Sequence, residues 1–185
     1  VFLSDNGPAT YTKVATGEPL KGGKLTEFQG GIRVPFIFKW KNHFPENTIY
    51  DKSVCALDIF TTVAALCSID LPTDRVYDGV NLIPYLSRQN EGTPHEKLFW
   101  RADHVHAIVK GDYKLIYSSR DKWAELYNLK TDEGEKNNLY LLMPEKVKEL
   151  NDDLLEWEKT LPAKPMWPRI MDHRFMIDGK EYLFP

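Results

Sequence analysis

The sequence predicts an α/β unit over residues 1–91, followed by a small α+β unit over residues 92–185. Three observations support this fold class. The first half contains short apolar runs that end in turn residues, as strands of an α/β sheet do. Residues 53–68 are nearly all apolar, which is typical of a buried helix. After the turn-forming segment Glu91–Pro94, four short strand-like runs precede an amphipathic helix pattern, and this order is typical of an antiparallel sheet covered by one helix.

The composition excludes several classes of function. The chain has 185 residues, 42% of them hydrophobic, and a formal net charge of −3 with charges of both signs interspersed. It therefore carries no basic patch for nucleic acid. No run of about 18 apolar residues is present, so no membrane-spanning helix is predicted. Cys55 and Cys67 lie on the predicted helix about 18 Å apart, too far to pair, and we expect both to be buried thiols.

The first motif is a turn that follows an apolar run. Val1-Phe2-Leu3 has the character of the end of a buried strand, and turn residues from Ser4 to Pro8 stop it. Asp5 and Asn6 then offer a carboxylate and an amide oxygen at the carboxyl end of the strand, where open α/β sheets bind ligands. Hard divalent cations prefer these donors, so the turn predicts a metal site.

A second motif, Pro19-Leu20-Lys21-Gly22-Gly23-Lys24, predicts an anion-binding loop. Its glycines let the backbone approach an anion, and its two lysines supply positive charge. The motif differs from a nucleotide-binding P-loop, because glycine stands where lysine is needed and Leu25 follows Lys24 where Ser or Thr should hold magnesium. Metal ligands and an anion-binding loop in one segment indicate chemistry on an oxyanion.

These motifs, in this order and spacing, resemble the second half of sulfatases of the alkaline-phosphatase superfamily. The resemblance is carried by Ser4-Asp5-Asn6-Gly7, by the lysine loop and by Gly30-Gly31-Ile32-Arg33-Val34-Pro35. It continues to about Leu142 through Leu57–Thr62, Asp78–Leu86, Lys110–Leu115 and Glu125–Leu129. The resemblance implies hydrolysis of a sulfate ester, with sulfated carbohydrates as the expected substrates, and favours a periplasmic or secreted location.

The resemblance also implies roles for single residues. Asp5 and Asn6, together with upstream carboxylates, would hold a calcium ion, and Lys24 would be the sulfate-binding lysine. Gln29 stands where the family usually has glutamate, which removes the charge for an ion pair, Arg33 being one conceivable partner. Arg33 is either structural or lines the substrate site. Lys21 is expected to be a solvated residue at the rim of the site.

The family's nucleophile is a formylglycine made from a Cys/Ser-x-Pro-x-Arg motif, and this sequence contains no such motif. We therefore expect the chain to be the C-terminal part of a sulfatase and to be inactive by itself. Exposed backbone at residues 1–3 would favour self-association or pairing with a missing N-terminal part. Two alternatives stay open: a phosphodiesterase or phosphonate monoester hydrolase of the same superfamily, and a truncated, non-catalytic module that binds a glycan.

Two further features are predicted in the first unit. Val34–Trp40 is expected to contain a strand covered on both faces, because its apolar residues do not alternate with polar ones. Asp58 lies on the helix expected at residues 53–68, where a buried carboxylate needs hydrogen bonds. It is either a structural acid that fixes a neighbouring loop, which we favour, or a metal ligand.

The second unit is predicted to be an antiparallel meander covered by a helix. Strands are expected at Lys97–Arg101, Val105–Lys110, Tyr113–Ser118 and Trp123–Leu129. A helix is expected from Pro144, because apolar residues recur at helical spacing, namely Val147, Leu150, Leu154, Trp157 and Leu161. The tail from Pro162 to Pro185 is expected to wrap over the surface, since it is rich in apolar residues, namely Met166, Trp167, Phe175, Met176, Tyr182 and Phe184.

One polar cluster accompanies the first two strands of the meander. Trp100, Arg101, His104 and His106 are candidates for contact with a glycan, which would stack on the indole ring and hydrogen-bond to the polar side chains. The alternative is that they are ordinary residues of a strand edge. His-x-His is also a spacing that binds metal, but residues two apart on a strand share a face without implying a further ligand.

Overall fold

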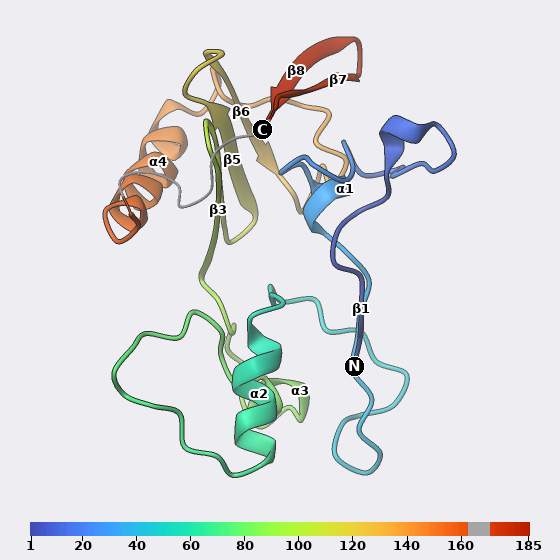
Figure 1. Cartoon of the computed structure of the whole chain (residues 1–185), viewed down its shortest axis with the longest axis vertical. Helices are drawn as coiled ribbons and strands as arrows, with labels where there is room; N and C mark the ends of the chain where they lie inside the picture. Colours follow the sequence, from blue (N-terminus) through green and yellow to red (C-terminus); the bar gives the residue numbers. More distant parts are fainter. Residues whose placement is uncertain (163–170) are drawn as a thin grey trace. The chain divides into compact units, whose positions relative to one another are not determined.

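The computed structural model describes residues 1–162 and 171–185. Contacts divide the chain into two compact units, and Figure 1 labels most of their helices and strands. The first unit comprises Val1–Leu3 and Phe36–Glu96, and the second comprises Ser4–Pro35 and Lys97–Pro185. The motifs of residues 4–35 thus pack with the second half of the chain. The domain boundary expected near residue 91 stays a prediction for the whole protein.

The first unit contains two short strands and two helices. Strand β1 (Phe2–Leu3) runs antiparallel to β2 (Phe36–Ile37). Helix α2 spans Asp58–Leu66, and α3 spans Ile83–Leu86. The strand predicted within Val34–Trp40 is therefore present, but it is only 2 residues long.

Helix α2 is shorter than the helix predicted from the apolar run. It begins at Asp58, after a turn in which the Asp58 N–H donates to the Cys55 carbonyl oxygen at 3.1 Å. It ends at Leu66, and Ser68 just beyond has left-handed backbone, with φ of 53°. Both cysteines lie outside α2, and Cys67 is exposed. The prediction of two buried thiols on one helix is therefore wrong, although both cysteines are free.

Helix α2 buries its polar side and exposes its apolar side. Asp58, Thr61 and Thr62 are buried, whereas Phe60 and Val63 are 58% and 46% exposed. Val1, Phe2 and Ile37 are also exposed, whereas Leu3 and Phe36 are half-buried. The prediction that this helix and these strands are buried is wrong for the described residues, because only limited contacts, such as the stacking of Tyr77 on Phe60, cover their apolar side chains.

The second unit confirms the predicted meander. Strands β3 (Lys97–Ala102), β4 (Val105–Lys110), β5 (Tyr113–Ser118) and β6 (Trp123–Asn128) form one antiparallel sheet in the order β3-β4-β5-β6. The unit also contains a 3-10 helix, η1 (Thr10–Thr12), a short α1 (Gln29–Ile32), the long α4 (Pro144–Glu158) and a hairpin of β7 (His173–Ile177) and β8 (Lys180–Phe184).

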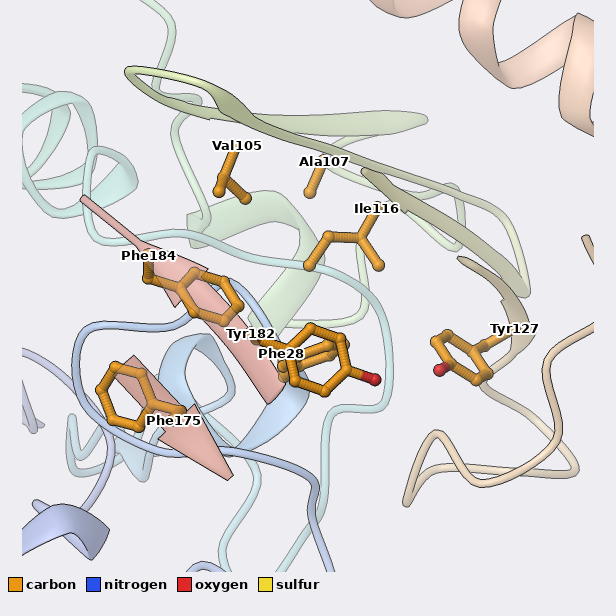
Figure 2. Packing of buried hydrophobic residues seen from close by; sticks show 8 residues of the cluster. All are labelled: Phe28, Val105, Ala107, Ile116, Tyr127, Phe175, Tyr182 and Phe184. Atoms are coloured by element: carbon orange, nitrogen blue, oxygen red, sulfur yellow. The ribbon is translucent and has the colours of Figure 1, made fainter. Parts of the chain in front are cut away.

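The sheet of the second unit is covered on both faces, because alternate residues of its strands point to opposite sides. Helix α4 covers one face, as predicted from its apolar spacing. Its residues Leu150 and Leu154 form a core with the sheet residues Ile108, Leu115 and Leu126. The other face packs on residues of the loop before α1 and of the terminal hairpin (Figure 2). This second cluster consists of Phe28, Val105, Ala107, Ile116, Tyr127, Phe175, Tyr182 and Phe184.

The tail differs from the surface wrap that its composition predicted. Its last residues form the β7–β8 hairpin, and Phe175, Tyr182 and Phe184 are core residues of the second unit. Met176 is 66% exposed, as expected for a residue that alternates with them along the strand. Met166 and Trp167 lie outside the described residues. In the part of the chain that the structure describes, no helix is long and apolar enough to span a membrane.

Candidate functional site

The two motifs singled out near the N-terminus are joined by backbone hydrogen bonds. The Gly7 N–H donates to the Gly31 carbonyl oxygen at 2.9 Å, and the Lys24 N–H donates to the Pro8 carbonyl oxygen at 2.9 Å. The Gly30 N–H, in the motif that begins at Gly30, donates to the Lys21 carbonyl oxygen of the lysine loop at 2.7 Å. These bonds place the turn after β1 beside the loop that carries Lys24, so the structure brings the two predicted motifs together.

This arrangement depends on glycine at two positions, because backbones touch there. A Cβ atom on Gly7 would lie 1.7 Å from the Gly30 carbonyl oxygen, and one on Gly31 would lie 2.0 Å from the Thr26 carbonyl oxygen. Both distances are far below van der Waals contact, so any side chain would push the segments apart. The glycines of the two motifs therefore hold the turn against the loop.

The predicted metal and sulfate ligands lie at the surface of this assembly. Asp5 is exposed, Asn6 and Lys24 are half-buried, and the Ser4 hydroxyl closes the turn by donating to the Asn6 carbonyl oxygen at 2.8 Å. Among residues 1–162 and 171–185, no hydrogen bond or ion pair engages the Asp5 carboxylate or the Lys24 ammonium. Both groups are thus available to a ligand.

Lys21 has a different environment from the one predicted, although it lies only three residues before Lys24. Its side chain is 5% exposed, and its ammonium donates to the hydroxyl oxygens of Tyr127 (2.9 Å) and Tyr182 (3.0 Å) and to Glu125 Oε2 (3.2 Å). It also lies 4.3 Å from the centroid of the Phe28 ring. The prediction of a solvated rim residue is wrong, because strand β6 and the terminal hairpin enclose this lysine.

Glu125 is the centre of the network around Lys21. It accepts hydrogen bonds from the Tyr127 hydroxyl at 2.7 Å and the Tyr182 hydroxyl at 2.8 Å, and it also accepts one from Lys180. Burial raises the pKa of Glu125, but the hydrogen bonds from Lys180 and Tyr127 outweigh it, and the net pKa is lowered. Glu125 is therefore a carboxylate, and it fixes the lysine loop to β6 and β8.

A second buried ion pair fixes the start of α1, five residues after the lysine loop. Lys114 donates to Glu135 Oε1 at 2.6 Å, and both side chains are 0% exposed. Glu135 Oε2 accepts the backbone N–H of Gln29 at 2.7 Å, at the first residue of α1. The structure thus positions residue 29 through its backbone. Arg33, the partner once conceivable for a glutamate at position 29, instead forms a surface ion pair with Glu133 at 3.1 Å.

Glu27 lies between the lysine loop and α1, and it is half-buried, with one buried carboxylate oxygen. Burial raises the pKa of its carboxyl group to about 7, although a backbone hydrogen bond and the Lys114 ammonium act in the opposite direction. Its Oε2 atom is buried and has no hydrogen-bond partner among the described residues. Near neutral pH this carboxyl group therefore changes its charge inside the protein.

No motif in the sequence predicted a role for Lys114, Glu125, Glu135 or Glu27. A signal was present for the first two, because Lys114 lies two residues before Ile116 and Glu125 two residues before Tyr127. Residues two apart on a strand share a face, so both charged side chains lie on the face that those core residues occupy. Charged residues at such inward positions indicate buried ion pairs. Glu135 and Glu27 lie in loops and carry no comparable pattern.

The other predicted substrate residues lie along the meander, and each has a protein partner. Trp100 packs against the core beside β4, and Arg101 donates to the Pro162 carbonyl oxygen at 3.1 Å. His104 Nε2 lies 3.2 Å from the Leu183 carbonyl oxygen. His106 Nδ1 contacts Glu158 of α4, and its ring stacks on Tyr117 at 4.8 Å. The two histidines thus engage different elements, and their role in substrate contact stays a prediction.

Asp58 fixes a neighbouring loop, as the favoured prediction of a structural acid expects, and its alternative role as a metal ligand stays a prediction. Its carboxylate accepts the backbone N–H groups of Cys55 and Val80, each at 2.8 Å, and so ties the start of α2 to the loop before α3. It also hydrogen-bonds to His95 Nε2 at 2.8 Å. That bond raises the pKa of His95 to about 9, so the imidazole is protonated at neutral pH. His95 was missed, since it lies 37 residues from Asp58 in an irregular segment.

Comparison with known structures identifies the class of protein that has this fold. The chain matches the crystal structure of Ps i-CgsB with a TM-score of 0.74 and 27% identity, over 84% of this chain and 35% of that chain. Curated relatives include an N-acetylgalactosamine-6-O-sulfatase of Bacteroides thetaiotaomicron, 30% identical over 86% of this chain and 36% of the relative. Human steryl-sulfatase is 42% identical over 53% of this chain and 18% of its own length. The class is that of the sulfatases.

The particular region of these enzymes follows from a family model. Residues 24–160 match the model described as N-sulphoglucosamine sulphohydrolase, C-terminal. The chain belongs to the sulfatase family and corresponds to the C-terminal part of these proteins. It spans about a third or less of the length of the curated relatives that it matches.

Proposed function

We propose that this chain supplies the C-terminal part of a sulfatase active site, in which Asp5, Asn6 and Lys24 bind the metal and the sulfate ester. The observation that carries the proposal is the pair of backbone hydrogen bonds that hold the Asp5-Asn6 turn beside Lys24, while the charged groups of Asp5 and Lys24 have no partner among the described residues. The nucleophile and further metal ligands would come from residues outside this chain.

The donors of the turn fit a calcium ion. A carboxylate and an amide oxygen are hard donors, and calcium takes 6–8 such oxygens, so Asp5 and Asn6 would supply part of its coordination sphere. A bound calcium ion would supply positive charge to polarise the sulfate ester. Lys24 would neutralise the charge that develops on the sulfate oxygens as the ester bond breaks. Lys21 would not contact substrate, because its ammonium is committed to Glu125.

The substrate class is proposed to be a sulfated carbohydrate. The support comes from relatives: the structure of Ps i-CgsB has been solved in complex with k-i-k-neocarrahexaose, and one curated relative is an N-acetylgalactosamine-6-O-sulfatase. The identity to steryl-sulfatase over 105 residues favours a second candidate, a sulfated sterol. Sulfate release from a 6-O-sulfated N-acetylgalactosamine and from a steryl sulfate, measured side by side, distinguishes the two.

The proposed metal site is tested in the active sulfatase that contains this chain. After removal of metal with a chelator, calcium should restore sulfate release, and Asp5→Ala or Asn6→Ala should raise the calcium concentration required for half of the activity. Asp51→Ala, at an exposed carboxylate of the first unit, is the matched control and should leave that concentration unchanged. Equal calcium requirements in all four proteins would contradict the assignment.

A further inference from the structure

Three side chains of the first unit bring a thiol, a carboxylate and an imidazole together. The ligand atoms of Cys55, Asp58 and His95 all lie within 4.8 Å of one another. Cys55 Sγ is 3.6 Å from Asp58 Oδ1 and 3.8 Å from His95 Nε2. This cluster is separate from the turn of Asp5 and Asn6, which belongs to the second unit.

The carboxylate of this cluster has a fixed orientation, because backbone N–H groups donate to it. The backbone N–H groups of Cys55 and Val80 each donate to one oxygen of Asp58, at 2.8 Å. Each carboxylate oxygen has a second lone pair, so these bonds orient the group without exhausting its capacity as a ligand. The side chains of Asp58 and His95 are 0% and 9% exposed, so the donors lie in a largely enclosed position. Hydrogen bonds of this kind orient ligands in metal sites.

The distances are close to those of a tetrahedral zinc site. With zinc bonds of about 2.3 Å to sulfur and about 2.0 Å to nitrogen or oxygen, sulfur lies about 3.5 Å from each of the other two ligands. The observed distances from Cys55 Sγ are 3.6 and 3.8 Å. His95 Nε2 and Asp58 Oδ1 are 2.8 Å apart, because a hydrogen bond joins them. If a zinc ion replaced the hydrogen atom of this bond, the two atoms would need to lie about 3.3 Å apart.

We propose that Cys55, Asp58 and His95 form a binding site for a thiophilic divalent metal of the zinc class. Zinc would take the Cys55 sulfur as thiolate and the His95 Nε2 as a neutral donor, and the two displaced protons would pass to solvent. The donor set differs from that of the turn, because thiolate and imidazole prefer zinc whereas carboxylate and amide oxygens prefer calcium. Three protein ligands leave the fourth position for water. The ion would join the start of α2 to the segment around His95.

The test is calorimetric titration of zinc into the reduced chain, with Cys67→Ser as the matched control at the other free cysteine. We expect one tightly bound zinc ion in the unaltered chain and in Cys67→Ser, and affinity lower by about 100-fold or more in Cys55→Ser. Cys55→Ser keeps the backbone N–H that Asp58 accepts, so the fold should persist, and circular dichroism checks this. His95→Gln is the second variant and should lose zinc similarly.

A second readout needs no change at the site. In Cys67→Ser, Cys55 is the remaining thiol, and bound zinc should slow its reaction with a thiol reagent, whereas calcium and magnesium should not. Cobalt in place of zinc should give the absorption of a thiolate-to-cobalt charge transfer. Zinc affinity unchanged by Cys55→Ser, or thiol reactivity unchanged by zinc, would overturn the proposal and leave the cluster as a hydrogen-bonded acid and histidine beside a thiol.

Discussion

The ammonium of Lys21 lies 2.9 Å from the hydroxyl oxygen of Tyr127, 106 residues away in the sequence. Lys24, three residues later, has no such partner among the described residues. Two lysines of the same loop thus have different environments. Lys21 fixes the loop to the sheet, and its fixed position leaves Lys24 at the surface beside the Asp5-Asn6 turn.

The first prediction concerns how much Lys21 and Lys24 each contribute to stability. Lys21→Met should destabilise the chain by about 3 kcal/mol, because it leaves the buried Glu125 with one fewer cation, and should lower Tm by about 10 °C. Lys24→Met should change the free energy of unfolding by less than about 0.5 kcal/mol. Thermal unfolding followed by circular dichroism measures both. Similar Tm values for the two variants would show that the Lys21 network does not hold the loop.

The second prediction concerns the pH dependence that Glu27 introduces. Its carboxyl pKa is raised from 4.5 to about 7 in the folded chain, so the folded state binds the proton more tightly than the unfolded state. Stability from this group is therefore complete below pH 4.5 and is lost as pH rises through about 7. A shift from 4.5 to 7 corresponds to about 3 kcal/mol.

Glu27→Gln removes this dependence, because glutamine stays neutral. The variant should be more stable than the unaltered chain at pH 8, by up to about 3 kcal/mol, and nearly equal to it at pH 5. Urea unfolding at the two pH values gives the comparison. The same ion pair between Lys114 and Glu135 lies beside residue 27 in both proteins, so it does not contribute to the difference between them. A stability difference that is the same at pH 5 and pH 8 would contradict the assignment of the raised pKa to Glu27.

The third prediction concerns the glycine contact that positions the turn. Gly7→Ala should destabilise the chain by about 2 kcal/mol or more, because its Cβ would lie 1.7 Å from the Gly30 carbonyl oxygen and neither backbone can move freely. Gly92→Ala is the control, since the nearest atom to its Cβ is the flexible Asn90 side chain at 3.0 Å. Unfolding free energies measure the contrast, and equal values would refute the close packing of turn and loop.

The fourth prediction concerns the exposed apolar side of α2. Phe60 and Val63 are 58% and 46% exposed, and patches of this kind are typical of interaction surfaces. We expect the 185-residue chain to associate in solution. Phe60→Asp should weaken this association, so that light scattering gives a lower molar mass for the species in solution, without lowering Tm. Leu141→Asp, at an 88% exposed residue of the second unit, should have no effect. A monomer at about 100 μM in the unaltered chain would contradict this prediction.

Local patterns predicted the second unit well and the first unit poorly. The meander and α4 follow from strand-length apolar runs and from the spacing of residues such as Leu150 and Leu154, which the chain itself covers. The apolar run that contains α2 predicted a buried helix, but the described residues leave its apolar side largely exposed. The environment of Lys21 was missed because its partners are 104 to 161 residues away, and no local pattern carries that information.

The candidate site divides in the same way. The sequence motifs predicted which residues gather, and the bonds from Gly7 to Gly31 and from Lys24 to Pro8 confirm that the two motifs lie together. The motifs did not predict how the loop is fixed. That depends on Glu125 and on Glu135, whose roles arise only when distant strands and loops meet.

The most direct test of the central claim is sulfate release by the active sulfatase that contains this chain, with Lys24→Met compared against Lys13→Met at an exposed loop lysine. We expect Lys24→Met to lower kcat/KM by about 100-fold or more with an unchanged Tm, because a charge that stabilises the transition state is lost. Lys13→Met should retain full activity. A folded Lys24→Met enzyme with activity within about threefold of the unaltered enzyme would contradict the claim that this lysine binds the sulfate group.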